Sequence, residues 1–200
     1  MLNVVKGCHV PCPEKLKEEF EMFSDTTIYA NINAEKIKDV FVKFIKMRQE
    51  PMFFVLHLPL DLDTQFSTSF NVGDEREYFF IDNLNQELAL ELLDDVSELL
   101  VNDGISRFGF GCHNTSDELF KDRFNMLSLT SMFLENYSSF FQELGVPQTD
   151  NLISAWDTFD EEHIGSIDRY EVNDLDAFGL PDYLKEKGWN LYAPELIPND

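Results

Sequence analysis

The chain has 200 residues, of which 44% are hydrophobic and 26% are charged, and its formal net charge is −23 at pH 7. The hydrophobic content can fill a core, which excludes an intrinsically disordered chain, because disorder combines high charge with low hydrophobicity. The negative field repels nucleic acid and anionic membranes and favours a basic protein partner. No apolar run reaches the roughly 18 residues of a membrane span.

The charge is unevenly distributed along the chain. Residues 1–50 carry 8 basic and 8 acidic side chains, whereas residues 51–200 carry 7 and 30. The three cysteines form an odd set in a chain too large to need disulfide bonds, and Met1–Pro13 has no signal-peptide pattern. We therefore expect a cytoplasmic protein with reduced thiols.

The first half of the chain predicts three helices and four strands. The helices cover Glu14–Phe23, Ala34–Arg48 and a segment from Asn83 or Asn85 to Val101, and the strands cover Thr27–Ile32, Met52–Leu60, Glu77–Ile81 and Ser106–Gly111. From residue 25 onward, the order is β-α-β-β-α-β, which is typical of ferredoxin-like folds.

The second half predicts the same order of elements. Its strands cover Asn125–Ser131, Leu152–Trp156, Ser166–Tyr170 and Trp189–Ala193, and its helices cover Asn136–Leu144 and Pro181–Lys187. We predict an α+β protein with an N-terminal segment (1–24), a first half (25–115) and a second half (116–200) packed as one unit. The halves form either tandem ferredoxin-like units or one extended mixed sheet.

A calcium-loop pattern covers Asp160–Glu171. Asp160 stands at the first position of an EF-hand loop, Gly165 at the sixth and Glu171 at the twelfth. The fifth position is Ile164, which has no side-chain oxygen for the ion. An acidic turn is the favoured interpretation, a degenerate calcium site stays as an alternative, and we expect no cofactor.

Cysteine and histidine give a second alternative. Cys8 and Cys12 have a permitted zinc spacing, but the chain has no second such pair. Cys112 and His113 are neighbours on a predicted strand, so their side chains should point to opposite faces. We predict no catalytic and no metal-binding residues, and a Cys/His-dependent or zinc-dependent hydrolase remains as the alternative.

An acidic stripe on the helix that ends at Val101 is the first candidate binding site. It consists of Glu87, Glu91, Asp94, Asp95 and Glu98, with no lysine among them. Like charges at i, i+4 destabilise a helix by roughly 0.2–0.5 kcal/mol per pair, which a surface for a cationic partner can tolerate. A merely solvated helix face is the alternative.

The second candidate is an acidic segment beside an aromatic anchor. Asp160, Glu161 and Glu162 follow Trp156 within a few residues. An acidic rim speeds association with a basic partner, and a buried aromatic ring contributes affinity. We therefore include these four residues in the predicted partner-binding set.

Three segments, Arg107–Gly111, Asp117–Lys121 and Ala155–Phe159, resemble small acidic bacterial proteins of toxin–immunity loci. The resemblance covers residues 75–195. It implies a non-enzymatic protein that binds a cognate toxin, often a basic nuclease, and blocks its action. Together with the charge, it predicts an immunity-type inhibitor that neutralises a basic protein toxin by electrostatic and aromatic contacts.

Overall fold

The fold is built on one sheet of seven strands. The computed structural model describes residues 1–48, 51–60 and 76–194. In this part of the chain, the strand order is β2-β3-β8-β7-β6-β4-β5, and every neighbouring pair is antiparallel. The strands are β2 (Glu19–Ser24), β3 (Thr27–Asn31), β4 (Met52–Pro59), β5 (Arg76–Leu84), β6 (Arg107–Cys112), β7 (Asp117–Lys121) and β8 (Met126–Thr130).

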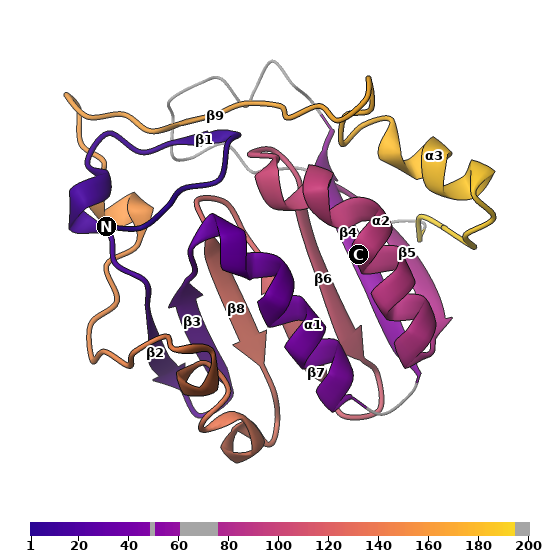
Figure 1. The fold of residues 1–200 in the computed structure, drawn as a ribbon, viewed down its shortest axis with the longest axis horizontal. Coiled ribbons are helices and arrows are strands. Elements are labelled where there is room, and N and C mark those ends of the chain that lie inside the picture. The colour runs from indigo at the N-terminus through magenta and orange to yellow at the C-terminus, as the bar shows by residue number, and fades with distance from the viewer. Residues whose placement is uncertain (49–50, 61–75, 195–200) are drawn as a thin grey trace, which may run out of the picture.

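Two α-helices cover one face of this sheet (Figure 1). They are α1 (Ile37–Met47), which continues a 3₁₀ turn at Ala34–Lys36, and α2 (Gln86–Asn102). Asn85 begins α2, because its side-chain oxygen accepts a hydrogen bond from the Leu88 backbone N–H at 2.8 Å. The apolar sides of both helices pack on alternate strand residues, such as Phe54 and Phe110, and these form the main core.

The remaining elements surround the sheet. A small second sheet pairs β1 (Cys8–His9) with β9 (Ser166–Ile167), and the third helix is α3 (Leu180–Glu186). The other 3₁₀ turns cover Pro13–Lys15, Leu134–Tyr137, Gln142–Leu144 and Ala155–Thr158. No helix within the described ranges is long and apolar enough to cross a membrane.

Two buried polar clusters connect distant segments to the sheet. The Lys121 side chain is fully buried, and its Nζ donates to the backbone oxygen of Asp103 at 3.3 Å. The Asp103 carboxylate accepts the backbone N–H groups of Ser106 (2.6 Å) and Tyr170 (3.0 Å). Because burial disfavours its charge, the pKa of Lys121 is lowered. Arg48 and Asp117 form the ion pair of the second cluster.

The α+β class is confirmed, and the arrangement found is the single extended sheet. Tandem ferredoxin-like halves are absent from the described residues, because β7 and β8 lie between β3 and β6 and join both halves in one sheet. The sequence did not predict β7. Eight of the predicted elements are confirmed within a few residues at their ends. They are the strands over Thr27–Ile32, Met52–Leu60, Glu77–Ile81, Ser106–Gly111 and Asn125–Ser131, and the helices over Ala34–Arg48, Asn85–Val101 and Pro181–Lys187.

Several other predicted elements are wrong. Instead of a helix, Glu14–Phe23 contains the end of a 3₁₀ turn and most of β2, because pairing with β3 outweighs local helix propensity. The segment Asn136–Leu144 forms 3₁₀ turns rather than an α-helix. Leu152–Trp156 is not a strand, since the Ser154 and Asp157 side chains cap a 3₁₀ turn there. Of the last predicted strands, Ser166–Tyr170 shortens to β9 and Trp189–Ala193 to one bridge between Phe80 and Tyr192.

Candidate functional site

A groove lies between α2 and the segment that follows α3. The Leu184 side chain is buried in the main core, and the Tyr183 hydroxyl donates to Asp95 Oδ1 at 2.8 Å. These two contacts hold α3 against α2. Two residues after the end of α3, Gly188 adopts a left-handed φ of 92°, and the Trp189 N–H donates back to the Leu184 oxygen at 3.0 Å. The chain therefore turns Trp189 toward α2.

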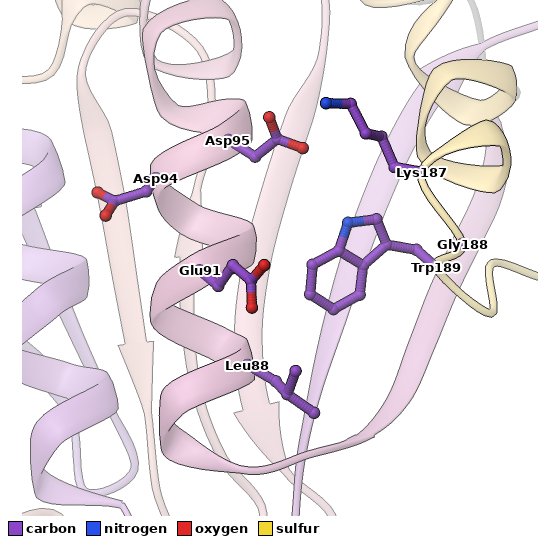
Figure 2. Close-up of a pocket in the computed structure, with 7 residues that line it drawn as sticks. All are labelled: Leu88, Glu91, Asp94, Asp95, Lys187, Gly188 and Trp189. Atoms are coloured by element: carbon purple, nitrogen blue, oxygen red, sulfur yellow. The ribbon is translucent and has the colours of Figure 1, made fainter.

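The groove has one acidic side and one aromatic side. Its volume is about 550 Å³, and its lining consists of Leu88, Glu91, Asp94, Asp95, Lys187, Gly188 and Trp189. Figure 2 shows the Trp189 indole opposite Glu91 and Leu88, with Lys187 on the side of Asp95. The indole is half-buried against the main core, which fixes its position.

Three of the five residues of the predicted acidic stripe line this groove. They are Glu91, Asp94 and Asp95, whereas Glu87 and Glu98 are exposed on α2 outside its lining. Asp94 turns away from Trp189 in Figure 2 and forms an ion pair with Lys38 Nζ of α1 at 2.7 Å. Both partners are substantially exposed, so this pair stabilises the fold little.

Glu91 is the acidic residue best placed to receive a ligand. Within the described part of the chain, it has neither a hydrogen bond nor an ion pair, and its side chain faces the indole of Trp189 (Figure 2). A carboxylate opposite an indole ring suits a cationic group, because the ring attracts it by a cation–π interaction and the carboxylate by charge. The groove can therefore accept a lysine or arginine side chain.

The second predicted set lies elsewhere on the molecule. Trp156 belongs to the 3₁₀ turn Ala155–Thr158 and packs edge-on against Phe124, with ring centroids 4.9 Å apart. The Asp160 carboxylate accepts a hydrogen bond from the His163 backbone N–H and also bonds the His163 ring, and the ring contact lowers its pKa. Glu161 and Glu162 are exposed. Trp156 thus helps to hold the small core around the N-terminal segment, apart from the α2 groove.

The residues of the two alternative functions do not converge. Among the described residues, no group of three or more His, Cys, Asp or Glu side chains could hold a metal ion. The segment Asp160–Glu171 runs into β9 and has no α-helix directly on either side, unlike an EF-hand. Cys112 points into the main core, whereas His113 stacks on Phe53 on the other face of the sheet, and burial raises the pKa of the Cys112 thiol.

Sequence reasoning missed the aromatic side of the groove. The sequence predicts a strand from Trp189 to Ala193, and nothing in the local pattern places Trp189 beside Glu91, about a hundred residues earlier in the chain. Gly188 is the one local indication of this position, because a glycine shortly after a helix commonly reverses the chain. Lys187, at the end of the same helix, was also missed.

No family model, no curated protein and no solved structure matches this chain. The class of this protein is therefore described here by its fold and groove alone. It is an α+β protein with a seven-stranded antiparallel sheet, two α-helices on one face, and an acidic groove beside the second helix.

Proposed function

We propose that this chain is a non-enzymatic binding protein that neutralises a basic protein partner, in the manner of an immunity protein that blocks its toxin. The groove in which Glu91 and Asp95 lie across from Trp189 carries the proposal. It combines a charge that attracts a basic surface with a ring that can hold a cationic side chain.

The charge of the whole chain favours such a partner. With 38 acidic and 15 basic side chains, the protein attracts cationic surfaces over distances near the Debye length, which is about 8 Å at physiological salt. Such steering raises the association rate, whereas the half-buried indole of Trp189 would contribute mainly to slow dissociation. The two sides of the groove thus have separable kinetic roles.

Lys187 leaves room for a cation from the partner. Its Nζ lies over the Tyr183 ring, 5.3 Å from the centroid, and on the side of Asp95 rather than Glu91 (Figure 2). The side chain is exposed and can move at little cost. The space between Glu91 and Trp189 is therefore the position we assign to the partner's lysine or arginine.

The cytoplasm and a bacterial toxin–immunity locus are part of the same proposal. Cys8, Cys12 and Cys112 are free thiols, which agrees with a reducing compartment. The choice of a toxin as the basic partner is supported by the resemblance of three segments to immunity-type proteins. These segments are Arg107–Gly111, Asp117–Lys121 and Ala155–Phe159.

The first experiment is capture of the partner from the native host with the tagged full chain, at low salt and then at high salt. A stoichiometric basic protein should be released by salt, and its association with purified protein should then be measured by biolayer interferometry. We expect the pair Glu91→Lys and Asp95→Asn to slow association at least about tenfold and to flatten its salt dependence. Asn at position 95 can still accept the Tyr183 hydrogen bond.

The matched control is the pair Glu161→Lys and Glu162→Gln, which makes the same change in charge on the other predicted acidic segment. It should alter association less than twofold. If the control slows association and the groove variant does not, the partner binds beside Trp156. If neither variant has an effect, neither acidic segment guides the interaction and the proposal fails.

A further inference from the structure

The outer edge of β2 is paired only in part. β2 is the first strand of the sheet, so one of its edges faces away from β3 (Figure 1). The Phe20 N–H donates to the Pro147 oxygen at 3.0 Å, and the Thr149 N–H donates to the Phe20 oxygen at 2.8 Å. A few residues later the chain turns to one face of the strand, where the Leu152 N–H donates to the Glu21 carboxylate at 2.9 Å. The edge is therefore left open beyond Phe20.

Met22 is the next residue whose backbone groups point outward. Glu21 is paired with Tyr29 of β3, and backbone groups alternate in direction along an antiparallel strand. Phe20 and Met22 therefore both face the edge. Among the described residues, the Met22 N–H and C=O form no hydrogen bond. An open edge position of this kind can pair with an extended segment of another chain.

Several large apolar side chains are exposed at the same end of the sheet. The turn between β2 and β3 lies beside the end of β8, because the Ser131 N–H donates to the Thr26 oxygen at 2.9 Å. Single exposed apolar side chains are ordinary on a protein surface, whereas a group of them indicates a contact surface. The group at this end consists of Met22, Phe23, Met132 and Phe133.

Phe23 is the ring best placed to anchor a ligand. The register between β2 and β3 shifts from Met22 to Ser24, which leaves Phe23 as the extra residue of a bulge. Bulges at sheet edges commonly re-aim a side chain. The Phe23 ring lies against the Tyr29 ring, with centroids 4.8 Å apart, yet the residue is 62% exposed. The ring is thus held in place while most of it stays open to a partner.

The segments that form this end of the sheet contain acidic residues but neither lysine nor arginine. Both basic types are absent from residues 18–35, which include β2 and β3, and from residues 124–168, which include β8. Asp25 follows the open edge, Glu135 follows the apolar pair after β8, and both are exposed. Lys43 of α1, which donates to the backbone of the segment after β8, already has an acidic partner. The local charge therefore favours a basic ligand.

The same charges disfavour a second copy of the chain at this edge. Antiparallel pairing of two copies about Met22 would set Asp25 of each copy opposite Glu19 of the other, and like charges directly opposite one another destabilise a strand pair. It would also require the edge groups of Phe20, which are already bonded within the chain.

We propose that the open end of the β2 edge is a docking surface for an extended segment of a protein partner, whose apolar side chains contact Phe23 and Met132 and whose lysines or arginines face Asp25 and Glu135. Hydrogen bonds with the Met22 backbone align the segment, the apolar contacts provide most of the affinity, and the charge selects a basic sequence. The surface lies at the edge of the sheet opposite β5 and does not rest on the α2 groove.

The test is an NMR titration of the ¹⁵N-labelled full chain with the peptide acetyl-Lys-Val-Lys-Val-Lys-Val-amide. We expect the amide signals of residues 22–25 and of Met132 to shift. Hydrogen exchange of the Met22 amide should slow at least about fivefold at saturation, because an open edge amide becomes hydrogen-bonded. The peptide in which glutamate replaces each lysine should bind at least about fivefold more weakly.

Three variants locate the binding site of this peptide. Phe23→Ser should weaken binding at residues 22–25 at least about fivefold, because it removes the aromatic anchor. The matched control is Ile164→Ser, which removes an exposed apolar side chain just before β9 and should bind like the wild type. The groove variant, Glu91→Lys with Asp95→Asn, should keep the shifts at residues 22–25. Failure of the groove and failure of the β2 edge are therefore distinguishable.

Three results would overturn the inference. Shifts confined to α2 and Trp189 would leave the proposed function intact and show that the β2 edge binds no extended segment. Equal binding of the lysine and glutamate peptides would contradict the selection by charge. Protection of the Met22 amide that rises with protein concentration in the absence of peptide would show that a second copy of the chain occupies the edge.

Discussion

Asp117 and Glu118 are neighbours on β7, so their side chains point to opposite faces of the sheet. The surroundings of the two carboxylates differ. On the helix side, Asp117 is only 5% exposed, pairs with Arg48 and accepts the Ser131 hydroxyl. Arg48 in turn lies over the Tyr137 ring, 4.8 Å from its centroid. On the other side, Glu118 has none of these contacts among the described residues. The Asp117 charge is thus compensated within the chain, whereas among the described residues the Glu118 carboxylate is not.

The aromatic residues show the same difference. Phe108 and Phe110 of β6 are fully buried beneath α1, and Phe108 stacks on Phe41 at 4.7 Å. On the opposite face, Phe80 and Phe120 are only partly buried and Tyr192 is 42% exposed, although Phe53 is buried. The comparison teaches that the rings on the helix side are packed completely, whereas those on the other side range from the buried Phe53 to the exposed Tyr192 and should contribute less to stability on average.

Removal of one ring from each face should give the largest effects. Phe110→Ala should lower the free energy of unfolding by about 4 kcal/mol, because the ring is fully buried between Phe41 and Phe54. Phe120→Ala should cost about 1–2 kcal/mol, since solvent already reaches that ring. Urea unfolding followed by circular dichroism measures both values. Equal costs would mean that the two faces are packed alike.

The helix side of the fold could be predicted from the sequence because its periodicities are clear. Ile37, Val40 and Phe41 recur at helical spacing in α1, and β4 is a nearly continuous apolar run. By contrast, β7 could not be recognised. Its core-facing positions are Asp117, Leu119 and Lys121, so two of its three inward side chains are charged. Their partners come from other parts of the chain, and without β7 the strand order reads as two repeats.

The candidate site could be predicted only in part, for a similar reason. The acidic stripe is local, so the spacing of Glu87, Glu91 and Asp95 reveals it from the sequence alone. The groove depends on α3 docking against α2 through Tyr183 and on the chain reversal at Gly188. Contacts between residues this far apart in sequence have no local signature, and the same holds for the isolation of Glu118.

A side chain added beneath a ring should sharpen the comparison with an intermediate effect. Gly111→Ala should lower the free energy of unfolding by about 2 kcal/mol, because its Cβ would overlap the Phe53 ring and approach the Asp117 backbone oxygen at 2.8 Å. Phe53→Leu, made together with Gly111→Ala, should recover part of that loss. Urea unfolding of the single and double variants gives the coupling free energy. Strict additivity would show that the ring does not rest on the glycine.

The smallest effect should come from His57, a partly buried polar residue on the face opposite α1 and α2. Burial and the nearby Arg76 and Arg107 lower its pKa to about 4, so the folded protein holds it neutral. The unfolded chain binds a proton near pH 6.5, and stability is therefore lost as the pH falls from about 6.5 toward 4. Between pH 7 and pH 5, the wild type should lose about 1 kcal/mol more than His57→Gln, after allowance for partial exposure. Urea unfolding at the two pH values measures this difference. Equal losses of stability in the wild type and His57→Gln would mean that His57 has the same pKa in the folded and unfolded chain.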